Sequence, residues 1–181
     1  MPSWQKIARR IRVPLGFLFA AFYLWLAHPT AASLLAGIGL VVVGLAVRAL
    51  ASGHVKKNEE LTTSGPYAYT RNPLYLGSIL LAAGFVIASR NWIIAAIALA
   101  LLFIIYMPVI RGEEQFLRSR FPEFEPYSRH VPRLFPYRAA YPSSPGSFNW
   151  HLYWKHREYN AAIGAAAMMV ALAAKAFLLH K

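Results

Sequence analysis

The sequence predicts an all-α integral membrane protein with about five transmembrane helices. Of its 181 residues, 57% are hydrophobic and only 14% are charged, whereas about a quarter of the residues in a soluble domain are charged. Long apolar runs separated by short polar segments repeat along the chain, and the mean hydropathy is +0.39. Most of these runs are long enough to cross a bilayer as a helix. We therefore expect one membrane domain over residues 1–181.

The apolar runs give the expected order of the spans. They are residues 13–27, 31–50, 74–88, 92–110 and 161–179. Basic residues precede the first run, as they do in a signal peptide. The second run begins after only three residues, 28–30, which favours a retained helical hairpin over cleavage.

The short connection at Ser89–Asn91 makes the third and fourth spans antiparallel neighbours. The polar segments 53–77 and 112–137 must then return to the same side of the membrane. The last helix is expected to run unbroken over 149–180, a length of roughly 48 Å against a hydrocarbon core of roughly 30 Å. Its first turns, which carry Trp150 and Trp154, should therefore stand outside the core and pack on that same side.

Glycines are spaced to bring helices close together. Gly77 and Gly84 share one face of the third span, and Gly37, Gly39 and Gly44 lie in the second. Small residues on facing sides let membrane helices approach closely. We expect these glycines to pack helix against helix.

The distribution of basic residues sets the expected orientation. With the N-terminus in the cytoplasm, only Arg90, Lys175 and Lys181 lie outside, which leaves 16 of the 19 Lys and Arg residues inside (19 minus 3). Cytoplasmic loops carry such an excess. The net charge of +12 is thus explained by topology, and we expect no nucleic-acid partner because the basic residues flank apolar runs.

The composition argues against a metal site. The chain has no cysteine, and all seven of its acidic residues are glutamate. Its histidines show no ligand spacing such as i, i+4. They are His28, His54, His130, His151, His156 and His180. We expect no metal.

The segment GPYAYTRNPLYLG, residues 65–77, ends a polar loop and opens an apolar helix. Asn72 is a favourable N-cap, and proline is tolerated at the first helical position, so the helix should start at Pro73. The positive end of the helix then lies beside Arg71, where a carboxylate or phosphate would be favoured. A helix start with an aromatic belt and a snorkelling arginine is the alternative interpretation.

The segment 112–137 follows the fourth span and begins with Glu113 and Glu114. Two carboxylates at a helix C-terminus oppose the macrodipole, and this unfavourable placement suggests a function, although a solvated helix end is the alternative. Prolines at 122, 126, 132 and 136 prevent one continuous helix. Because the segment is rich in aromatic residues, we expect it to fold back over the helix ends as an interfacial lid.

Together the two segments resemble the membrane-integral methyltransferases that include isoprenylcysteine carboxyl methyltransferase and the phospholipid N-methyltransferases. That family has Arg-His-Pro-x-Tyr-x-Gly, one or two apolar helices, a Glu-Glu pair, then a Tyr and a Val-Pro near a closing Pro. Asn72 replaces the usual His. The matching residues, within roughly 53–137, are Arg71, Asn72, Pro73, Tyr75, Gly77, Glu113, Glu114, Tyr127, Val131, Pro132 and Pro136.

The resemblance implies methyl transfer from S-adenosylmethionine to a lipid-like or isoprenoid acceptor at the cytoplasmic interface, with S-adenosylhomocysteine as product. It implicates Arg71 and Glu113 in catalysis, and His54 is a candidate general base or a loop histidine without a role. The family's arginine beside Val-Pro has only a loose match in Arg129 or Arg133. The candidate cofactor-binding residues are Tyr67, Asn72, Pro73, Tyr75, Gly77, Glu114, His130, Pro132 and Leu134.

The residue types in the two segments suit this chemistry. Methyl transfer from a sulfonium requires alignment of donor and acceptor, exclusion of water and, for a protonated acceptor, a base. Glutamate accepts hydrogen bonds from ribose hydroxyls or an amino group, and an arginine fork suits a carboxylate. Which glutamate contacts the cofactor, and whether nitrogen or oxygen is methylated, stays open.

Two other functions remain as alternatives. Membrane sterol reductases share a similar Arg-x-Pro-x-Tyr region and bind NADPH, but Glu113 and Glu114 would repel a 2′-phosphate. A membrane transporter or scaffold would not need the proline-rich segment, and transporters usually show two repeated halves. The sequence shows no such repeat.

Overall fold

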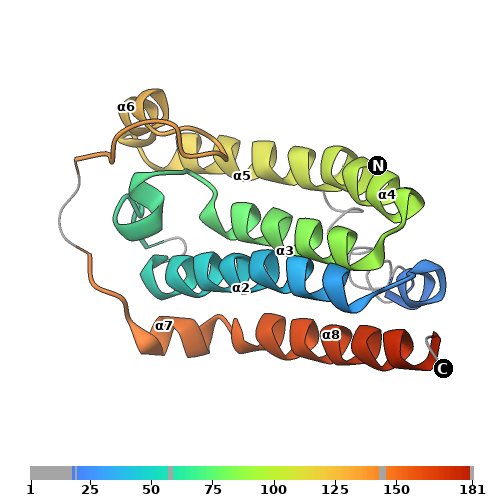
Figure 1. Cartoon of the computed structure of the whole chain (residues 1–181). Helices are drawn as coiled ribbons and strands as arrows, with labels where there is room; N and C mark the ends of the chain where they lie inside the picture. The colour runs from blue at the N-terminus through green and yellow to red at the C-terminus, as the bar shows by residue number, and fades with distance from the viewer. Residues whose placement is uncertain (1–17, 19, 57–58, 143–145, 180–181) are drawn as a thin grey trace.

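The computed structural model describes residues 18, 20–56, 59–142 and 146–179. All regular structure in these residues is helical (Figure 1). Residues 20–26 form the first described helix. The helices that follow are α2 (Ala31–His54), η1 (Gly65–Ala68), α3 (Pro73–Ser89), α4 (Trp92–Leu101), η2 (Leu102–Tyr106), α5 (Met107–Arg120), α6 (Phe124–His130), α7 (Trp150–Lys155) and α8 (Tyr159–Leu179).

Three stretches of the described chain are long and apolar enough to span a membrane. They are Ala31–His54, Trp92–Arg120 and Tyr159–Leu178, and α3 is a shorter apolar helix of 17 residues. The prediction of an all-helical membrane fold is confirmed. The expected first span, 13–27, lies mainly outside the described residues, so the number of five spans stays a prediction.

The closest helix packing is between α2 and α3. A Cβ atom added at Gly37 would lie 2.5 Å from the carbonyl oxygen of Gly84, and one at Gly44 would lie 2.7 Å from that of Gly77. The predicted glycine contacts are confirmed at these positions, because only hydrogen fits there. Gly39 is the exception, since a Cβ there would meet nothing within 4 Å.

The helix of the fourth span does not end near Ile110, where the sequence had suggested an end. The helix continues through the π-helical turn η2 and Pro108 to Arg120, so Glu113 and Glu114 lie inside α5. Leu117 extends the helix because it packs against the buried cluster of Phe124, Tyr127 and Val131. The argument that the two carboxylates oppose a helix C-terminus was therefore wrong.

The last helix is broken where a single helix was expected. It divides into α7 and α8 at Arg157, whose φ is +53°. The residues on either side of Arg157 turn toward α2: the His156 Nδ1 atom lies 3.1 Å from the Ser52 carbonyl oxygen, and Glu158 pairs with Arg48. These polar contacts favour the break over a straight helix.

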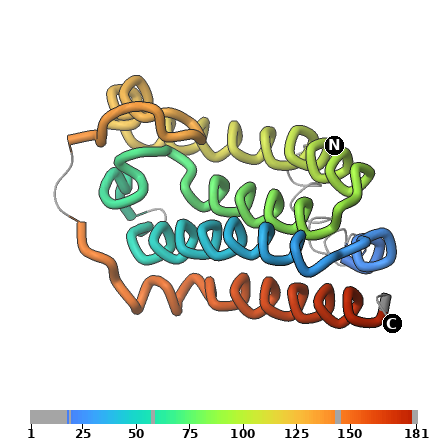
Figure 2. The backbone as a smooth tube through the Cα atoms, viewed as in Figure 1, coloured from blue at the N-terminus to red at the C-terminus, as the bar shows by residue number. Residues whose placement is uncertain are grey.

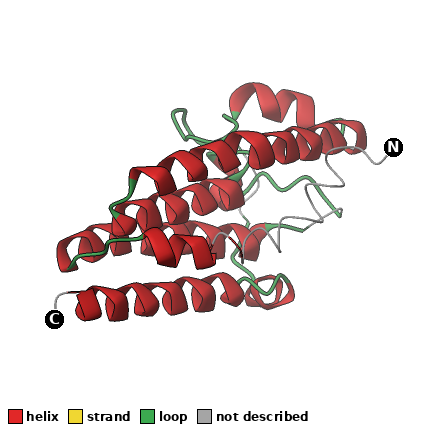
Figure 3. Ribbon diagram, turned by 90° about the vertical axis from the view of Figure 1, so that its right-hand side faces the viewer, coloured by secondary structure: helices red, strands yellow, loops and turns green. Residues whose placement is uncertain are grey.

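Both polar segments lie at one end of the helix bundle, on the left in Figures 1 and 2. The C-terminal end of α5, the short helix α6, η1 and the start of α3 meet there, and Figure 3 shows the long helices side by side from another direction. The chain after α6 crosses this end: the Arg71 amide donates to the Pro132 carbonyl at 2.9 Å, and the Tyr141 amide to that of Ala68 at 2.9 Å.

Candidate active site

The centre of the site is Glu114, which is only 5% exposed. Arg133 donates to its carboxylate from Nε at 3.1 Å and from Nη2 at 2.8 Å, and the amide of Asn72 donates at 3.2 Å. The Nη1 atom of Arg71 lies 3.6 Å from the same carboxylate. These four residues, the Glu114 cluster, join the two polar segments, as predicted from the antiparallel third and fourth spans.

Asn72 occupies the N-cap position of α3 but does not cap the helix with its side chain. Its amide nitrogen donates instead to Glu114 and, at 3.1 Å, to the carbonyl oxygen of Arg133. The expected capping role of this side chain was wrong. Capping needs its oxygen to accept from an N–H of the first turn, but the two hydrogen bonds that its nitrogen donates fix the side chain in another orientation. Pro73 at the first helical position has no N–H that would need a partner.

Arg71 is held in place without being fully paired. Its side chain is 12% exposed, and among the described residues its Nε is the only buried side-chain nitrogen or oxygen that lacks a hydrogen-bond partner. Burial lowers the pKa of Arg71, and the nearby Glu114 partly offsets that effect. Such an orphaned donor is costly unless a ligand satisfies it.

The charges of the Glu114 cluster do not cancel. Two guanidinium groups face one carboxylate. Hydrogen bonds to Glu114 raise the pKa of Arg133, so this side chain stays protonated. The cluster therefore keeps one net positive charge in a largely buried setting. It can hold an anionic group, such as a carboxylate or a phosphate.

The second glutamate has a different environment. Glu113 is half-buried, and its carboxylate accepts a hydrogen bond of 2.9 Å from the Tyr75 hydroxyl. The Tyr75 ring packs edge-on against Tyr106, with 5.8 Å between the ring centroids. Glu114 is engaged by three neighbouring side chains, whereas Glu113 retains acceptor capacity for a ligand.

Two buried aromatic residues, Tyr67 and Tyr127, link the two polar segments near the cluster. The Tyr127 hydroxyl donates to the Tyr67 carbonyl oxygen at 2.7 Å, and both side chains are buried. Burial raises the pKa of both phenols, so they stay neutral. Pro132 and Leu134, both buried, flank Arg133, and the Pro132 carbonyl oxygen accepts from the Arg71 amide just before α3.

Three predicted site residues lie elsewhere. His54 places Nδ1 2.7 Å from the Leu50 carbonyl oxygen and packs against Phe148. His130 places Nδ1 3.0 Å from the Pro126 carbonyl oxygen, on an exposed surface. Gly77 contacts α2, where an added Cβ would lie 2.5 Å from the Arg48 side chain.

Sequence reasoning left one role open and missed one interaction. Arg129 and Arg133 were both neighbours of the Val-Pro pair. In the structure Arg133 pairs with Glu114, while Arg129 pairs with Glu125 at 3.5 Å, and the role itself stays a prediction. The ion pair between Arg48 and Glu158 was not foreseen. A charged residue inside an otherwise apolar run was the available signal, because such residues are rarely left unpaired.

A family comparison covers most of the residues of this site. The phospholipid methyltransferase family matches residues 30–123, just over half of the chain, including Arg71, Glu113 and Glu114. The chain belongs to the phospholipid methyltransferase family. The match ends before Arg133, so this family's matched region contains three of the four members of the Glu114 cluster.

Two curated relatives are known by their association with metal resistance. The cobalt-zinc-cadmium resistance protein CzcN of Cupriavidus metallidurans is 35% identical over 127 residues, which are 70% of this chain and 56% of that protein. The nickel-cobalt-cadmium resistance protein NccN of Alcaligenes xylosoxydans xylosoxydans is 37% identical over 81 residues, 45% of this chain and 38% of that protein. This chain thus spans about half the length, or less, of the curated relatives it matches. No solved structure matches it.

Proposed function

We propose that this protein transfers a methyl group from S-adenosylmethionine to a lipid-like acceptor, at the cytoplasmic face of a membrane. The observation that supports this most directly is the buried, incompletely paired Arg71 at the start of an apolar helix. An anion-binding group at the edge of a membrane suits an amphiphile whose polar end carries a phosphate or a carboxylate.

The residues present fit the donor as well as the acceptor. S-adenosylmethionine offers a carboxylate, an amino group and ribose hydroxyls, and supplies an electrophilic methyl group on sulfur. Arg133 is 41% exposed and uses Nε and Nη2 for Glu114, which leaves Nη1 for a carboxylate. Glu113 and the uncapped first turn of α3 offer acceptors and donors beside it.

Each member of the site then has a distinct role. Arg71 orients the anionic group of the acceptor, and Glu114 positions both Arg71 and Arg133. The acceptor's lone pair forms the new bond to the methyl carbon, while the electrons of the broken carbon–sulfur bond stay on the leaving thioether. Where the acceptor is an ammonium group, Glu113 accepts its proton.

The chain after α6 completes the site as a lid. Residues 131–142 hydrogen-bond to Arg71 and Ala68 and cross the start of α3. In this position they shield the Glu114 carboxylate from water, which strengthens its electrostatic interactions. The excess of basic residues at this end supports a cytoplasmic location.

Family membership favours this function over a sterol reductase or a transporter. The names of the relatives raise direct metal binding as another function. Within the described residues no group of three or more His, Cys, Asp or Glu side chains is placed to hold a metal ion.

Calorimetry with S-adenosylhomocysteine tests the donor site. We expect the purified protein to bind this product, and Glu113→Gln to weaken binding, because a charged hydrogen-bond acceptor is lost. Glu59→Gln is the matched control, since Glu59 is exposed and only 3.8 Å from Lys155 in a surface pair. A folded wild-type protein that shows no binding would contradict the proposed function.

A further inference from the structure

An apolar cavity lies beneath the candidate active site. Its volume is about 420 Å³, it is partly open, and it is lined by residues of α2, α3, α4, η2, α8 and the helical residues 20–26. Ala82, Ala98, Ala161 and Gly164 line its middle part. This volume is within the usual range for small-molecule sites. An apolar lining at the depth of the membrane suits hydrocarbon better than water.

The polar residues of the cavity are concentrated near the end that faces the candidate active site. They include Arg48, Ser78 and Tyr106. The Tyr106 ring packs against Tyr75, whose hydroxyl donates to Glu113. This cavity end therefore lies next to the Tyr75–Glu113 pair of the candidate active site, and a ligand with its polar end there would have its chain in the apolar part.

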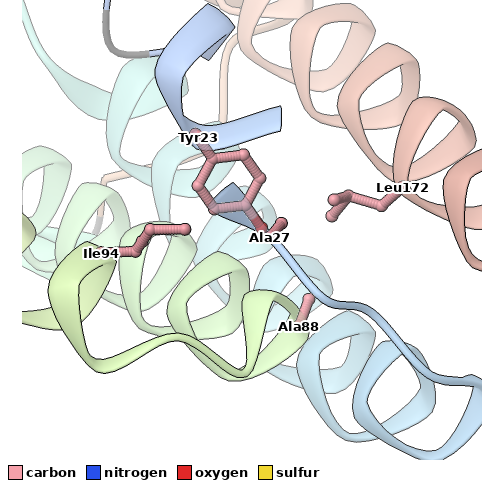
Figure 4. Close-up of a cluster of buried hydrophobic side chains, with 5 residues drawn as sticks. All are labelled: Tyr23, Ala27, Ala88, Ile94 and Leu172. Atoms are coloured by element: carbon pink, nitrogen blue, oxygen red, sulfur yellow. The ribbon is translucent and has the colours of Figure 1, made fainter. Parts of the chain in front are cut away.

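The opposite end of the cavity is closed by a well-packed floor. Tyr23 and Ile94 line the cavity and are 3% and 1% exposed. The Tyr23 hydroxyl donates to the Phe85 carbonyl oxygen at 2.7 Å, which fixes its ring across the bundle. Figure 4 shows that both side chains belong to a buried cluster with Ala27, Ala88 and Leu172.

The distance between the two ends limits the ligand. Along α3 the lining runs from Ser78 to Val86, which corresponds to about 12 Å at 1.5 Å per residue. One leaflet of the hydrocarbon core is roughly 15 Å deep, half of the whole core. A chain that fills its leaflet is thus longer than the cavity.

We propose that this cavity holds one alkyl chain of the methyl acceptor, and that the floor formed by Tyr23 and Ile94 limits the chain length. The identity of the ligand as the acceptor rests on the proposed function, but the binding of an alkyl chain does not. A chain too long for the cavity must bend or leave it, and so loses the benefit of each further methylene group.

The test is competitive binding of fatty acids to the detergent-purified protein, without S-adenosylmethionine. An equimolar mixture of saturated fatty acids, from octanoic to palmitic acid, is added, and the bound acids are identified by native mass spectrometry. All variants share the same partition of acids into micelles, so differences between variants report the cavity. We expect the wild-type protein to select a chain shorter than palmitic acid.

Two kinds of variant test the location. Ala98→Phe fills the cavity, whereas Ala96→Phe adds the same side chain to an exposed position of the same helix. We expect Ala98→Phe to abolish the chain-length selection and Ala96→Phe to retain it. Ile94→Ala should shift the selection to longer chains, with about a fourfold gain for each methylene newly accommodated. Met168→Ala enlarges the same region and replaces Ile94→Ala if that variant does not fold.

The outcomes separate this proposal from the proposed function. Equal chain profiles in the wild type, Ala98→Phe and Ala96→Phe would overturn it, and so would a floor variant that folds but leaves the profile unchanged. The expected profiles in a protein that fails to bind S-adenosylhomocysteine would support the cavity proposal and contradict the proposed methyl transfer.

Discussion

Replacement of Glu114 by glutamine is the most informative perturbation of the site. The glutamine has nearly the same shape, but it removes the one negative charge that faces Arg71 and Arg133. Breaking a buried ion pair by removing one partner costs about 3–5 kcal/mol, because the remaining charge is left uncompensated. Arg133 is 41% exposed, so solvent reduces its share, and we expect a loss of roughly 2–4 kcal/mol.

This loss of stability can be measured as a decrease in Tm: the detergent-purified protein is heated, and the folded fraction that remains at each temperature is quantified by size-exclusion chromatography. For a chain of this size, a loss of this magnitude corresponds to a decrease in Tm of roughly 5–15 °C. Glu113→Gln is the matched control on the next residue, since Glu113 is less buried and accepts one hydrogen bond from Tyr75. Equal decreases for the two variants would refute the view that Glu114 holds the cluster together.

Three further predictions follow from particular contacts. Arg71→Lys keeps the charge but loses the guanidinium fork, so methyl transfer should decrease roughly a hundredfold. The affinity for S-adenosylhomocysteine, measured by calorimetry, should change little. Proportional losses of methyl transfer and of affinity would place Arg71 in the donor site. Gly37→Ala should lower the Tm, because its Cβ would lie 2.5 Å from the Gly84 carbonyl oxygen. Gly39→Ala should leave the Tm unchanged, because nothing lies within 4 Å of a Cβ at that position. A similar Tm for the two variants would contradict the packing described. The chain has no native cysteine, so single introduced cysteines can report the orientation. A cysteine in place of the exposed His28 should react with an impermeant thiol reagent from outside intact cells, whereas one in place of the exposed Tyr137 should not. The opposite labelling pattern would reverse the proposed orientation.

The sequence was most informative where a pattern repeats or a turn is short. The apolar runs predicted the helices, and the short connection after α3 predicted that Arg71 and the glutamate pair would lie on the same side, where Arg71 contacts Glu114. Both depend on local features that a single sequence contains. The glycine contacts between α2 and α3 were predictable for the same reason, except at Gly39.

The errors arose where tertiary contacts outweighed local preference. Asn72 has the residue type of an N-cap, but its side-chain nitrogen donates to the buried Glu114 carboxylate and the side chain does not cap α3. Residues 149–180 have the composition of one helix, but Glu158 pairs with Arg48 and the helix breaks beside it. No residue pattern within one segment could reveal a partner that is about a hundred residues away.

His54 shows the limit of inference from residue type alone. A histidine near the site was a reasonable candidate for a base, yet its ring packs against Phe148 and its Nδ1 faces the Leu50 carbonyl oxygen. The half-buried carboxylate of Glu113, with the Tyr75 hydroxyl beside it, is the group that the fold brings to the site. A role for His54 as the base therefore stays a prediction, and Glu113 is the group that we propose for it.

Labelling of membrane lipids tests the central claim most directly. Membranes that contain the wild-type protein, the Arg71→Lys variant or no added protein are incubated with S-adenosylmethionine that carries a radioactive methyl group, and the lipids are extracted into organic solvent. We predict label in a lipid product with the wild type and roughly a hundredfold less with Arg71→Lys. Lipid labelling by the folded wild-type protein that does not exceed the membranes without it would contradict methyl transfer to a lipid-like acceptor.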